Sequence, residues 1–122
     1  MATKEQIEDI KFKLSIAMEY KKLYKQLDLD LTTLAVAVGI SCWSLSDLIK
    51  SAYGIGFREY LNDIRIRKVL EEIARFGDSL EVNNYARLVG FRSRVSFFNA
   101  FKSRLGKSVS QYISENTSLD NY

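Results

Sequence analysis

An internal repeat constrains the fold of this chain more than any other feature of its sequence. Residues 34–54, LAVAVGISCWSLSDLIKSAYG, align with residues 85–106, YARLVGFRSRVSFFNAFKSRLG, when one residue is inserted after the first glycine. In each copy a small residue, Ala35 or Ala86, stands four positions before a glycine, and a serine then precedes a helical run. Two steeply crossed helices need a small side chain at their contact and a turn that tolerates positive φ. The repeat therefore predicts two helix-turn-helix units.

Helix caps predict that the rest of the chain is all-α. The sequence has no proline and only six glycines, so little interrupts its helical periodicity. Caps are expected at Asp30 or Thr32, Ser41, Ser93 and Ser108, and helix ends at Gly39, Gly54, Gly77, Gly90 and Gly106. The pattern predicts helices over residues 3–27, 43–53, 57–75, 82–89 and 94–105, with short helices that end at Val38 and Ile113, and no strand.

The sequence predicts about seven to eight helices, arranged along the chain in the following order. We expect an amino-terminal lead-in helix (1–30), a first helix-turn-helix unit (31–56), a long connecting helix (57–76), a second unit with a final short helix (77–114) and a flexible tail (115–122). Apolar residues of the connecting helix should pack against both units and fix their separation. At about 1.5 Å per residue it spans roughly 28 Å, close to the roughly 34 Å between successive major grooves on one side of B-DNA.

Composition excludes several kinds of chemistry. The chain has no histidine and one cysteine, Cys42, so the usual zinc sites, a Cys-His or Ser-His catalytic pair and an internal disulfide are impossible within it. We expect no enzyme, no metal and no cofactor. No apolar run of about 18 residues exists, and the opening MATKEQIEDIKFK is too charged for a secretory signal. We therefore expect a cytoplasmic protein with no membrane partner.

Basic charge is concentrated in the second half of the chain, which holds every arginine. Residues 83–114 contain six arginines and lysines and no acidic residue. Such a block is often a solvated face, but it also fits neutralisation of a nucleic-acid backbone. The candidates for phosphate contacts are Lys50 in the first unit and Arg87, Arg92, Ser93, Lys102, Arg104 and Lys107 in the second.

Projection of the second helix of each unit at 100° per residue separates core from surface. We expect Leu45, Leu48, Ile49, Ala52 and Tyr53 inside the first unit, and Phe97, Phe98, Phe101 and Leu105 inside the second. In a helix-turn-helix the opposite face enters the major groove. Asn99 suits adenine, Arg94 guanine and Val95 a thymine methyl, while Ser44 and Ser96 suit either a base or a phosphate.

Two outward residues leave alternatives open. Trp43 either meets a partner or packs on the amino-terminal helix, since an exposed tryptophan is costly without a cover. Asp47 either accepts a hydrogen bond from a cytosine amino group or points away from DNA.

The runs GIGFREYLNDIRI (54–66) and GFRSRVSFFNAFK (90–102) carry a resemblance to the DNA-binding domain of AraC-type transcription regulators, over roughly residues 31–113. The resemblance implies seven helices, with two helix-turn-helix units on a connecting helix. By position it implies base contacts from Trp43, Ser46, Asp47, Arg94, Val95, Ser96 and Asn99. Ser108-Val109 stands where relatives have Thr-Pro or Ser-Pro, so the final helix should start less sharply.

The resemblance also implies double-stranded DNA as the partner, with RNA polymerase and a separate upstream sensing or dimerising domain as further candidates. A weak dimer seam over Ile7, Ile10, Leu14, Ala17 and Tyr24 competes with packing of these residues on the first unit. The main rival function is a protein-interaction module anchored by Trp43 and Tyr24.

Overall fold

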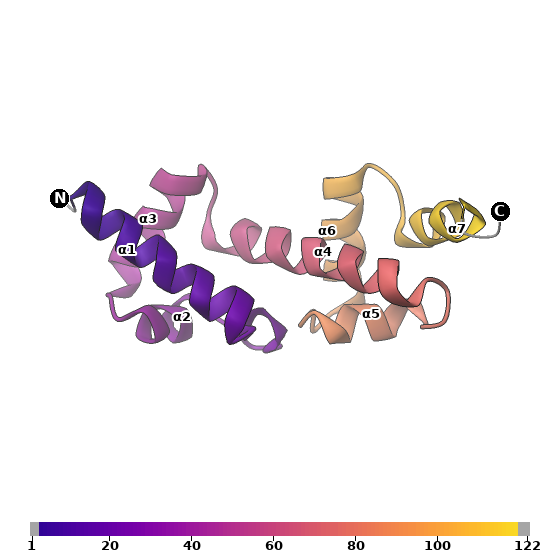
Figure 1. The fold of residues 1–122 in the computed structure, drawn as a ribbon, viewed down its shortest axis with the longest axis horizontal. Coiled ribbons are helices and arrows are strands. Elements are labelled where there is room, and N and C mark those ends of the chain that lie inside the picture. The colour runs from indigo at the N-terminus through magenta and orange to yellow at the C-terminus, as the bar shows by residue number, and fades with distance from the viewer. Residues whose placement is uncertain (1–2, 120–122) are drawn as a thin grey trace. The chain divides into compact units, whose positions relative to one another are not determined.

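The computed structural model describes residues 3–119, with side chains to residue 116, and all their regular elements are helical (Figure 1). The described residues contain no strand, and the predicted all-α class is confirmed. The chain divides into two compact units, one ending at Tyr60 and the other starting at Leu61. In chain order the elements are α1 (Lys4–Ser15), a π-helical turn (Ile16–Tyr20), a 3₁₀ turn (Leu23–Lys25), α2 (Leu31–Val38), α3 (Cys42–Tyr53), α4 (Phe57–Phe76), α5 (Val82–Leu88), α6 (Arg94–Leu105) and α7 (Val109–Leu119).

The first unit packs α1 and the π-helical turn against α2, and α2 against α3. A capping box starts α1, because the Thr3 hydroxyl accepts from the Gln6 backbone N–H at 3.1 Å and the Gln6 side chain accepts from the Thr3 N–H at 2.8 Å. The core of this unit includes Leu14, Ala17, Met18, Tyr24, Leu29, Leu34, Ala35, Val38, Leu45 and Ile49. Leu14, Ala17 and Tyr24, three of the five residues that could have formed a dimer seam, are thus buried inside their own unit, so for them the alternative of packing on the first unit holds.

The amino-terminal helix is shorter than predicted. We expected one helix over residues 3–27, but it ends with the π-helical turn, in which the Lys21 N–H bonds to the Ile16 carbonyl at 2.9 Å. Lys22 then adopts a left-handed conformation with φ of 55°, and the chain reverses into the 3₁₀ turn. This break lets Tyr24 and Leu29 enter the core, with 4% and 5% of their surface exposed.

Both helix-turn-helix turns are built in the same way. Gly39 has φ of 78°, and the N–H of Ile40 bonds to the Ala35 carbonyl at 3.1 Å. In the second unit Gly90 has φ of 94°, and the N–H of Phe91 bonds to the Ala86 carbonyl at 2.9 Å. Each of these hydrogen bonds closes a turn of six residues and satisfies a carbonyl group that the end of the helix would otherwise leave without a partner. The α2 and α3 axes bend by 92° at the turn.

Side-chain caps fix where the helices begin. Asp30, Ser41 and Ser93 accept from the backbone N–H groups of Thr33, Ser44 and Ser96, as predicted. The pKa of the Asp30 carboxyl is lowered because it accepts the hydrogen bond from the Thr33 N–H. α5 differs, since its N-cap residue is Glu81, whose side chain makes no capping bond.

Aromatic residues fill the second unit. Tyr85, Phe97 and Phe101 are wholly buried, and the ring centroid of Phe97 lies 5.3 Å from that of Phe91 and 6.0 Å from that of Phe101. Arg65 of α4 is also buried, and its guanidinium lies 5.6 Å from the Phe91 ring centroid. The two most distinctive runs of the sequence therefore meet at this contact, which is a cation–π interaction.

Two further predictions need correction. Ala52 and Tyr53 at the end of α3 are exposed, because the helix projects past the core there. Tyr53 stacks on Tyr60 instead, with 5.1 Å between ring centroids. The final helix runs to Leu119 and not to Ile113, so residues 115–119 of the predicted tail are helical, and residues 120–122 lie outside the described part.

Within residues 3–119, no single helix combines the length and hydropathy needed to cross a bilayer. The bent pair α2 and α3 meets both conditions only when its two helices are taken together.

We predict that Gly39→Ala destabilises the protein by about 1–2 kcal/mol, because an L-residue is strained in the left-handed region. No atom lies within 4 Å of an added Cβ, so the loss reports backbone strain alone. Gly39→Asn is the control and should cost less, because asparagine tolerates this conformation. Urea unfolding measures both variants. Equal losses would contradict the assigned turn.

Candidate nucleic-acid interface

The start of α3 is tied to α2 and to its own cap. The Ser41 hydroxyl accepts from the Ser44 N–H at 3.1 Å and donates to the Ser44 hydroxyl at 2.9 Å. The Cys42 thiol donates to the Thr32 hydroxyl of α2 at 3.4 Å. The first turn of α3 is therefore held in place before any partner arrives.

The outward face of α3 is open to solvent. Trp43 has 78% of its surface exposed, so the alternative in which it packs on the amino-terminal helix is wrong. Ser44, Ser46, Asp47 and Lys50 are exposed as well. An indole, hydroxyls, a carboxylate and an ammonium group thus stand together on one short helix.

The outward face of α6 occupies the equivalent place in the second unit. Arg94, Val95, Ser96 and Asn99 are all exposed, Val95 by 65%. The Arg94 guanidinium lies 4.9 Å from the centroid of the Phe98 ring. This contact orients Arg94 along the helix surface and covers Phe98, which is half-buried.

The lysines and arginines that are candidates for phosphate contacts fall into two groups. Lys50, Arg87, Arg92 and Lys102 are exposed and, among the residues the structure describes, form no ion pair. The other group is engaged within the chain. Arg104 lies 3.6 Å from the Asp63 carboxylate of α4, and Lys107 lies 2.6 Å from the Glu115 carboxylate of α7. Only the first group is free to meet phosphates without losing a partner.

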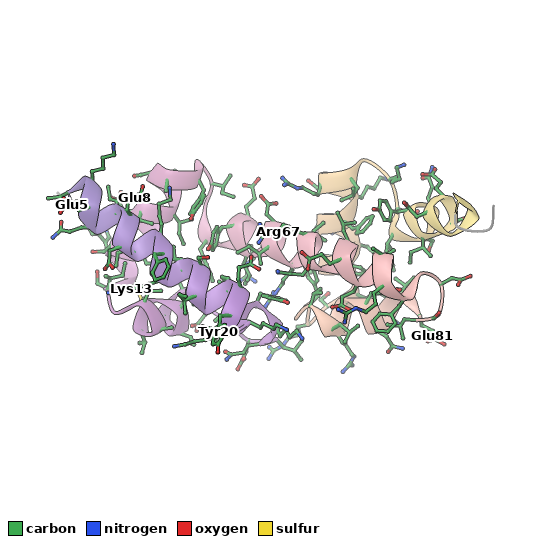
Figure 2. All side chains as sticks on the ribbon, viewed as in Figure 1. Glu5, Glu8, Lys13, Tyr20, Arg67 and Glu81 are labelled. Carbon is green, nitrogen blue, oxygen red and sulfur yellow. The ribbon has the colours of Figure 1, made fainter. Side chains whose placement is uncertain are left out.

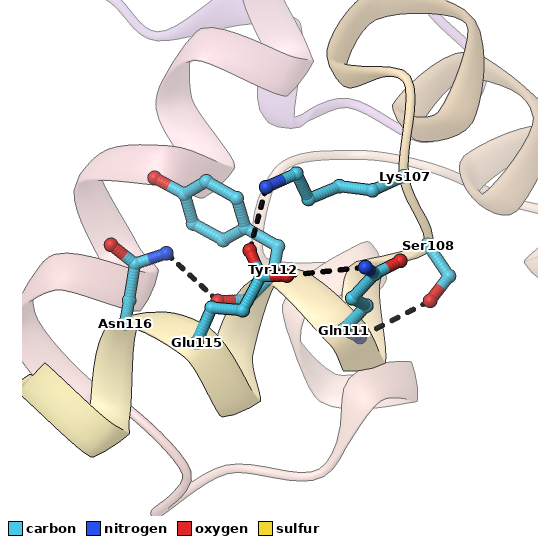
Figure 3. A network of polar contacts seen from close by, with 6 residues as sticks. All are labelled: Lys107, Ser108, Gln111, Tyr112, Glu115 and Asn116. Carbon is cyan, nitrogen blue, oxygen red and sulfur yellow. Dashed lines mark hydrogen bonds and ion pairs between the residues drawn. The ribbon is translucent and has the colours of Figure 1, made fainter.

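A polar network around Lys107 holds the start of α7 (Figure 3). Ser108 accepts from the Gln111 N–H at 3.1 Å, and the Gln111 side chain donates to Glu115 at 3.1 Å. The hydrogen bond from Lys107, followed by that from Gln111, lowers the pKa of the Glu115 carboxyl. The network gives the final helix a capped start, although Val109 and not a proline follows Ser108.

Glu115 and Asp63 are the residues that sequence reasoning missed. Both lie outside the acid-free block of residues 83–114, yet the fold brings them to two of its cations. A signal for Glu115 was present, because Gln111 and Glu115 stand four residues apart on one helix face. The partner of Arg104 lies 41 positions away in sequence (104 minus 63), and no local pattern predicts it.

Ser93 differs from the other phosphate candidates. Its side-chain oxygen accepts from the Ser96 N–H at 3.3 Å as the N-cap of α6. A hydroxyl in this role can still donate its own hydrogen to a phosphate.

No group of three acidic or cysteine side chains in the described part of the chain could hold a metal ion. Exposed donors, acceptors and cations stand on the outward faces of α3 and α6, which are both capped by serine.

Two helix-turn-helix units with outward polar helices define the class of double helix-turn-helix DNA-binding domains. Residues 34–115 match a family model described as a helix-turn-helix domain. The C-terminal domain of AraT, a response regulator from Geobacillus stearothermophilus, is 32% identical, with a TM-score of 0.70 over 84% of each chain. The chain belongs to the AraC-type helix-turn-helix family of transcription regulators.

Other solved structures share the fold. The C-terminal domain of the two-component response regulator yesN from Fusobacterium nucleatum is 25% identical, with a TM-score of 0.68 over 84% of this chain and 98% of that one. The DNA-binding domain of AdpA, solved with a target DNA, is 22% identical, with a TM-score of 0.74 over 90% and 94% of the two chains. No curated protein matches the chain at a significant level.

We predict that Lys107→Met raises the pKa of Glu115 toward its ordinary value of 4.5, because the main hydrogen bond to the carboxylate is lost. Since the folded-state pKa is lowered, the stabilisation is present above the ordinary pKa and is lost as the pH falls through the folded value. A carbon-detected NMR titration of the Glu115 carboxyl measures the change. Gln111→Ala is the matched variant and should give a smaller rise; an unchanged titration in Lys107→Met would contradict the network.

Proposed function

We propose that this DNA-binding domain recognises a specific double-stranded operator by placing α3 and α6 in two adjacent major grooves. The observation that carries the proposal is the exposure, at equivalent places of the repeat, of side chains suited to base edges: Trp43, Ser44, Ser46 and Asp47 on α3, and Arg94, Val95, Ser96 and Asn99 on α6. A monomer that reads two grooves needs no symmetric operator.

The α6 residues supply the sharper discrimination in this proposal. The Asn99 amide can pair with the N6 and N7 edge of adenine, and the Arg94 guanidinium with the O6 and N7 edge of guanine. Val95 offers methyl groups to thymine. Arg94 must leave the Phe98 ring to do so, and the cost of this weak contact is small compared with a bidentate pair.

The α3 face contributes differently. Trp43 covers apolar sugar or base surface, and the Ser44 and Ser46 hydroxyls reach bases or phosphates. Asp47 repels phosphate, so its carboxylate selects a cytosine amino group where it meets a base at all. The first unit therefore adds sequence choice with little electrostatic attraction.

Phosphate contacts come mainly from the second unit. Arg87, Arg92 and Lys102 are exposed without ion pairs in the described part of the chain, and neutralising backbone charge makes affinity salt-dependent. Arg104 and Lys107 contribute less, because each must give up a carboxylate partner. Contact with RNA polymerase and an additional sensing or dimerising domain are expectations that follow from the family, and action in the cytoplasm is an expectation from the composition of the chain.

Trp43 also favours a second candidate, a helical module that binds protein, although Tyr24, the other expected anchor, is only 4% exposed and belongs to the core. An indole with 78% exposure is a typical anchor of an interface. Such a module would show no salt-sensitive affinity for DNA and would lose its partner in Trp43→Ala.

Selection of bound fragments from random duplex DNA, followed by footprinting, tests the main proposal. We expect one consensus with two protected major-groove segments about one helical turn apart. Asn99→Ala should reduce the discrimination between bases at one base pair by about 1–3 kcal/mol. The control is Ser110→Ala on α7, where Ser110 is exposed; it should leave the consensus and the affinity for DNA unchanged. A single protected segment would refute reading of two grooves, and no consensus would refute specificity.

We predict that Arg92→Ala weakens DNA binding more than Lys50→Ala, because the second unit provides most of the phosphate neutralisation. The slope of log K against log salt should fall in magnitude by about 0.9 for each lost phosphate contact. Fluorescence anisotropy at several salt concentrations measures both. Equal losses in the two variants would contradict the asymmetry between the units.

A further inference from the structure

Arg65 of α4 is the one charged side chain that is buried among the residues the structure describes, with 4% of its surface exposed. Arg67, two positions further along the same helix, is exposed and is labelled on α4 in Figure 2. Burying a charge costs free energy unless its neighbours compensate for the lost water, and apolar side chains of similar size often give equal stability. Stability alone therefore gives a poor account of an arginine at this place in the core.

The Phe91 ring is a neighbour that compensates for part of this cost. The Arg65 guanidinium lies 5.6 Å from the centroid of the ring, within the range of a cation–π interaction, which is stronger where both groups are shielded from water. Phe91 is 3% exposed and directly follows Gly90, and its backbone N–H donates to the Ala86 carbonyl. Arg65 thus contacts the turn that sets the direction in which α6 leaves α5.

Two further ring contacts connect this turn with the outward face of α6. The Phe91 ring centroid lies 5.3 Å from that of Phe97, and the Phe97 ring centroid lies 5.9 Å from that of Phe98. Phe97 is wholly buried, and the Phe98 ring carries the guanidinium of Arg94 at 4.9 Å. Because packed rings have little free volume in which to adjust, a shift of the Phe91 ring also moves the turns of α6 that carry Arg94 and Asn99.

The first unit has no such contact at its turn. Ile40 stands at the equivalent place, where its N–H bonds to the Ala35 carbonyl. Ile40 is half-buried and aliphatic, so it offers no ring to a cation. No charged side chain is buried in the described part of this unit, residues 3–60. The buried cation therefore belongs to the turn before α6 alone, and α6 is the helix that carries the sharper base discrimination in the proposed function.

We propose that Arg65 is a positioning residue for base recognition by α6, an inference that rests on the proposed function. Its burial keeps the guanidinium away from phosphates, so Arg65 acts through the Phe91 ring and the elements packed around it. Hydrogen bonds to base edges need their donors within about 0.5 Å of the productive place, whereas attraction between charges extends over about 8–10 Å at moderate salt. Arg65 therefore governs the choice of sequence by α6 and has little influence on sequence-independent affinity.

Selection from random duplex DNA with the whole chain tests the proposal, and the base pair affected by Asn99→Ala identifies the part of the consensus that α6 reads. Arg65→Met removes the guanidinium and keeps an unbranched side chain. We expect the base pairs read by α6 to lose their preference together and operator affinity to fall by about tenfold. The base pairs read by α3, the affinity for random duplex and the salt slope should stay unchanged. A full consensus retained by Arg65→Met would overturn the proposal.

Val69→Ala is the matched control for lowered stability. Val69 is a wholly buried residue of the same helix, and its truncation leaves a cavity but keeps the guanidinium of Arg65. This variant should retain the whole consensus, while urea unfolding measures the stability of both proteins. An equal loss of preference in Val69→Ala and Arg65→Met would assign the effect to stability and contradict a positioning role.

Phe91→Leu reaches the same contact from the turn, and it decides the question alone if Arg65→Met does not fold. Leucine keeps an apolar side chain but removes the ring, so the base pairs read by α6 should lose preference again. The double variant should add little to either single change, and this cycle separates the ring contact from the other contacts of Arg65. A full consensus in Phe91→Leu, or additive losses in the double variant, would contradict the proposal.

Arg65→Lys keeps the charge without the planar group and should retain part of the preference that Arg65→Met loses. Equal losses in the lysine and methionine variants would contradict a role for the cation. Absence of any consensus with the unaltered protein would instead refute the proposed function, and this inference with it.

Discussion

The turn between the two helices of each unit is the constraint on which the outward faces of both α3 and α6 depend. A left-handed glycine and a hydrogen bond back to an alanine carbonyl end the first helix, at 3.1 Å for Ala35 and 2.9 Å for Ala86. A serine cap then restarts the chain in a new direction, by 92° in the first unit. Because the turn fixes the first residues of α3 and α6, it also decides which of their side chains stay in solvent.

Caps and glycines made most helix ends predictable, because each acts within a few residues of sequence. α2, α3, α4 and α6 begin and end within one residue of expectation. The break at Lys22 was not predictable, since lysine gives no signal for φ of 55° and only the burial of Tyr24 and Leu29 explains it. The exposure of Tyr53 was not predictable either. A helical projection places Tyr53 inside, but the buried residues of α3 are Leu45 and Ile49, and Tyr53 is 41% exposed.

The charge of the candidate interface depends on ion pairs with residues that lie outside the acid-free block of the sequence. An acid-free block of sequence is not acid-free in space, because Asp63 and Glu115 reach Arg104 and Lys107. The exposed residues of α3 and α6 were nevertheless predictable, since a capped amphipathic helix leaves one face in solvent. The roles proposed for them toward bases follow from the chemistry of their side chains.

An NMR titration with the selected operator tests the central claim most directly, because Trp43 and Asn99 report separately on the two units. The account predicts that the Trp43 indole and the Asn99 side-chain amide shift together and saturate at one domain per duplex, while α1 resonances stay in place. Shifts confined to one of the two helices, or saturation at different stoichiometries, would contradict reading of DNA by both units of the same chain.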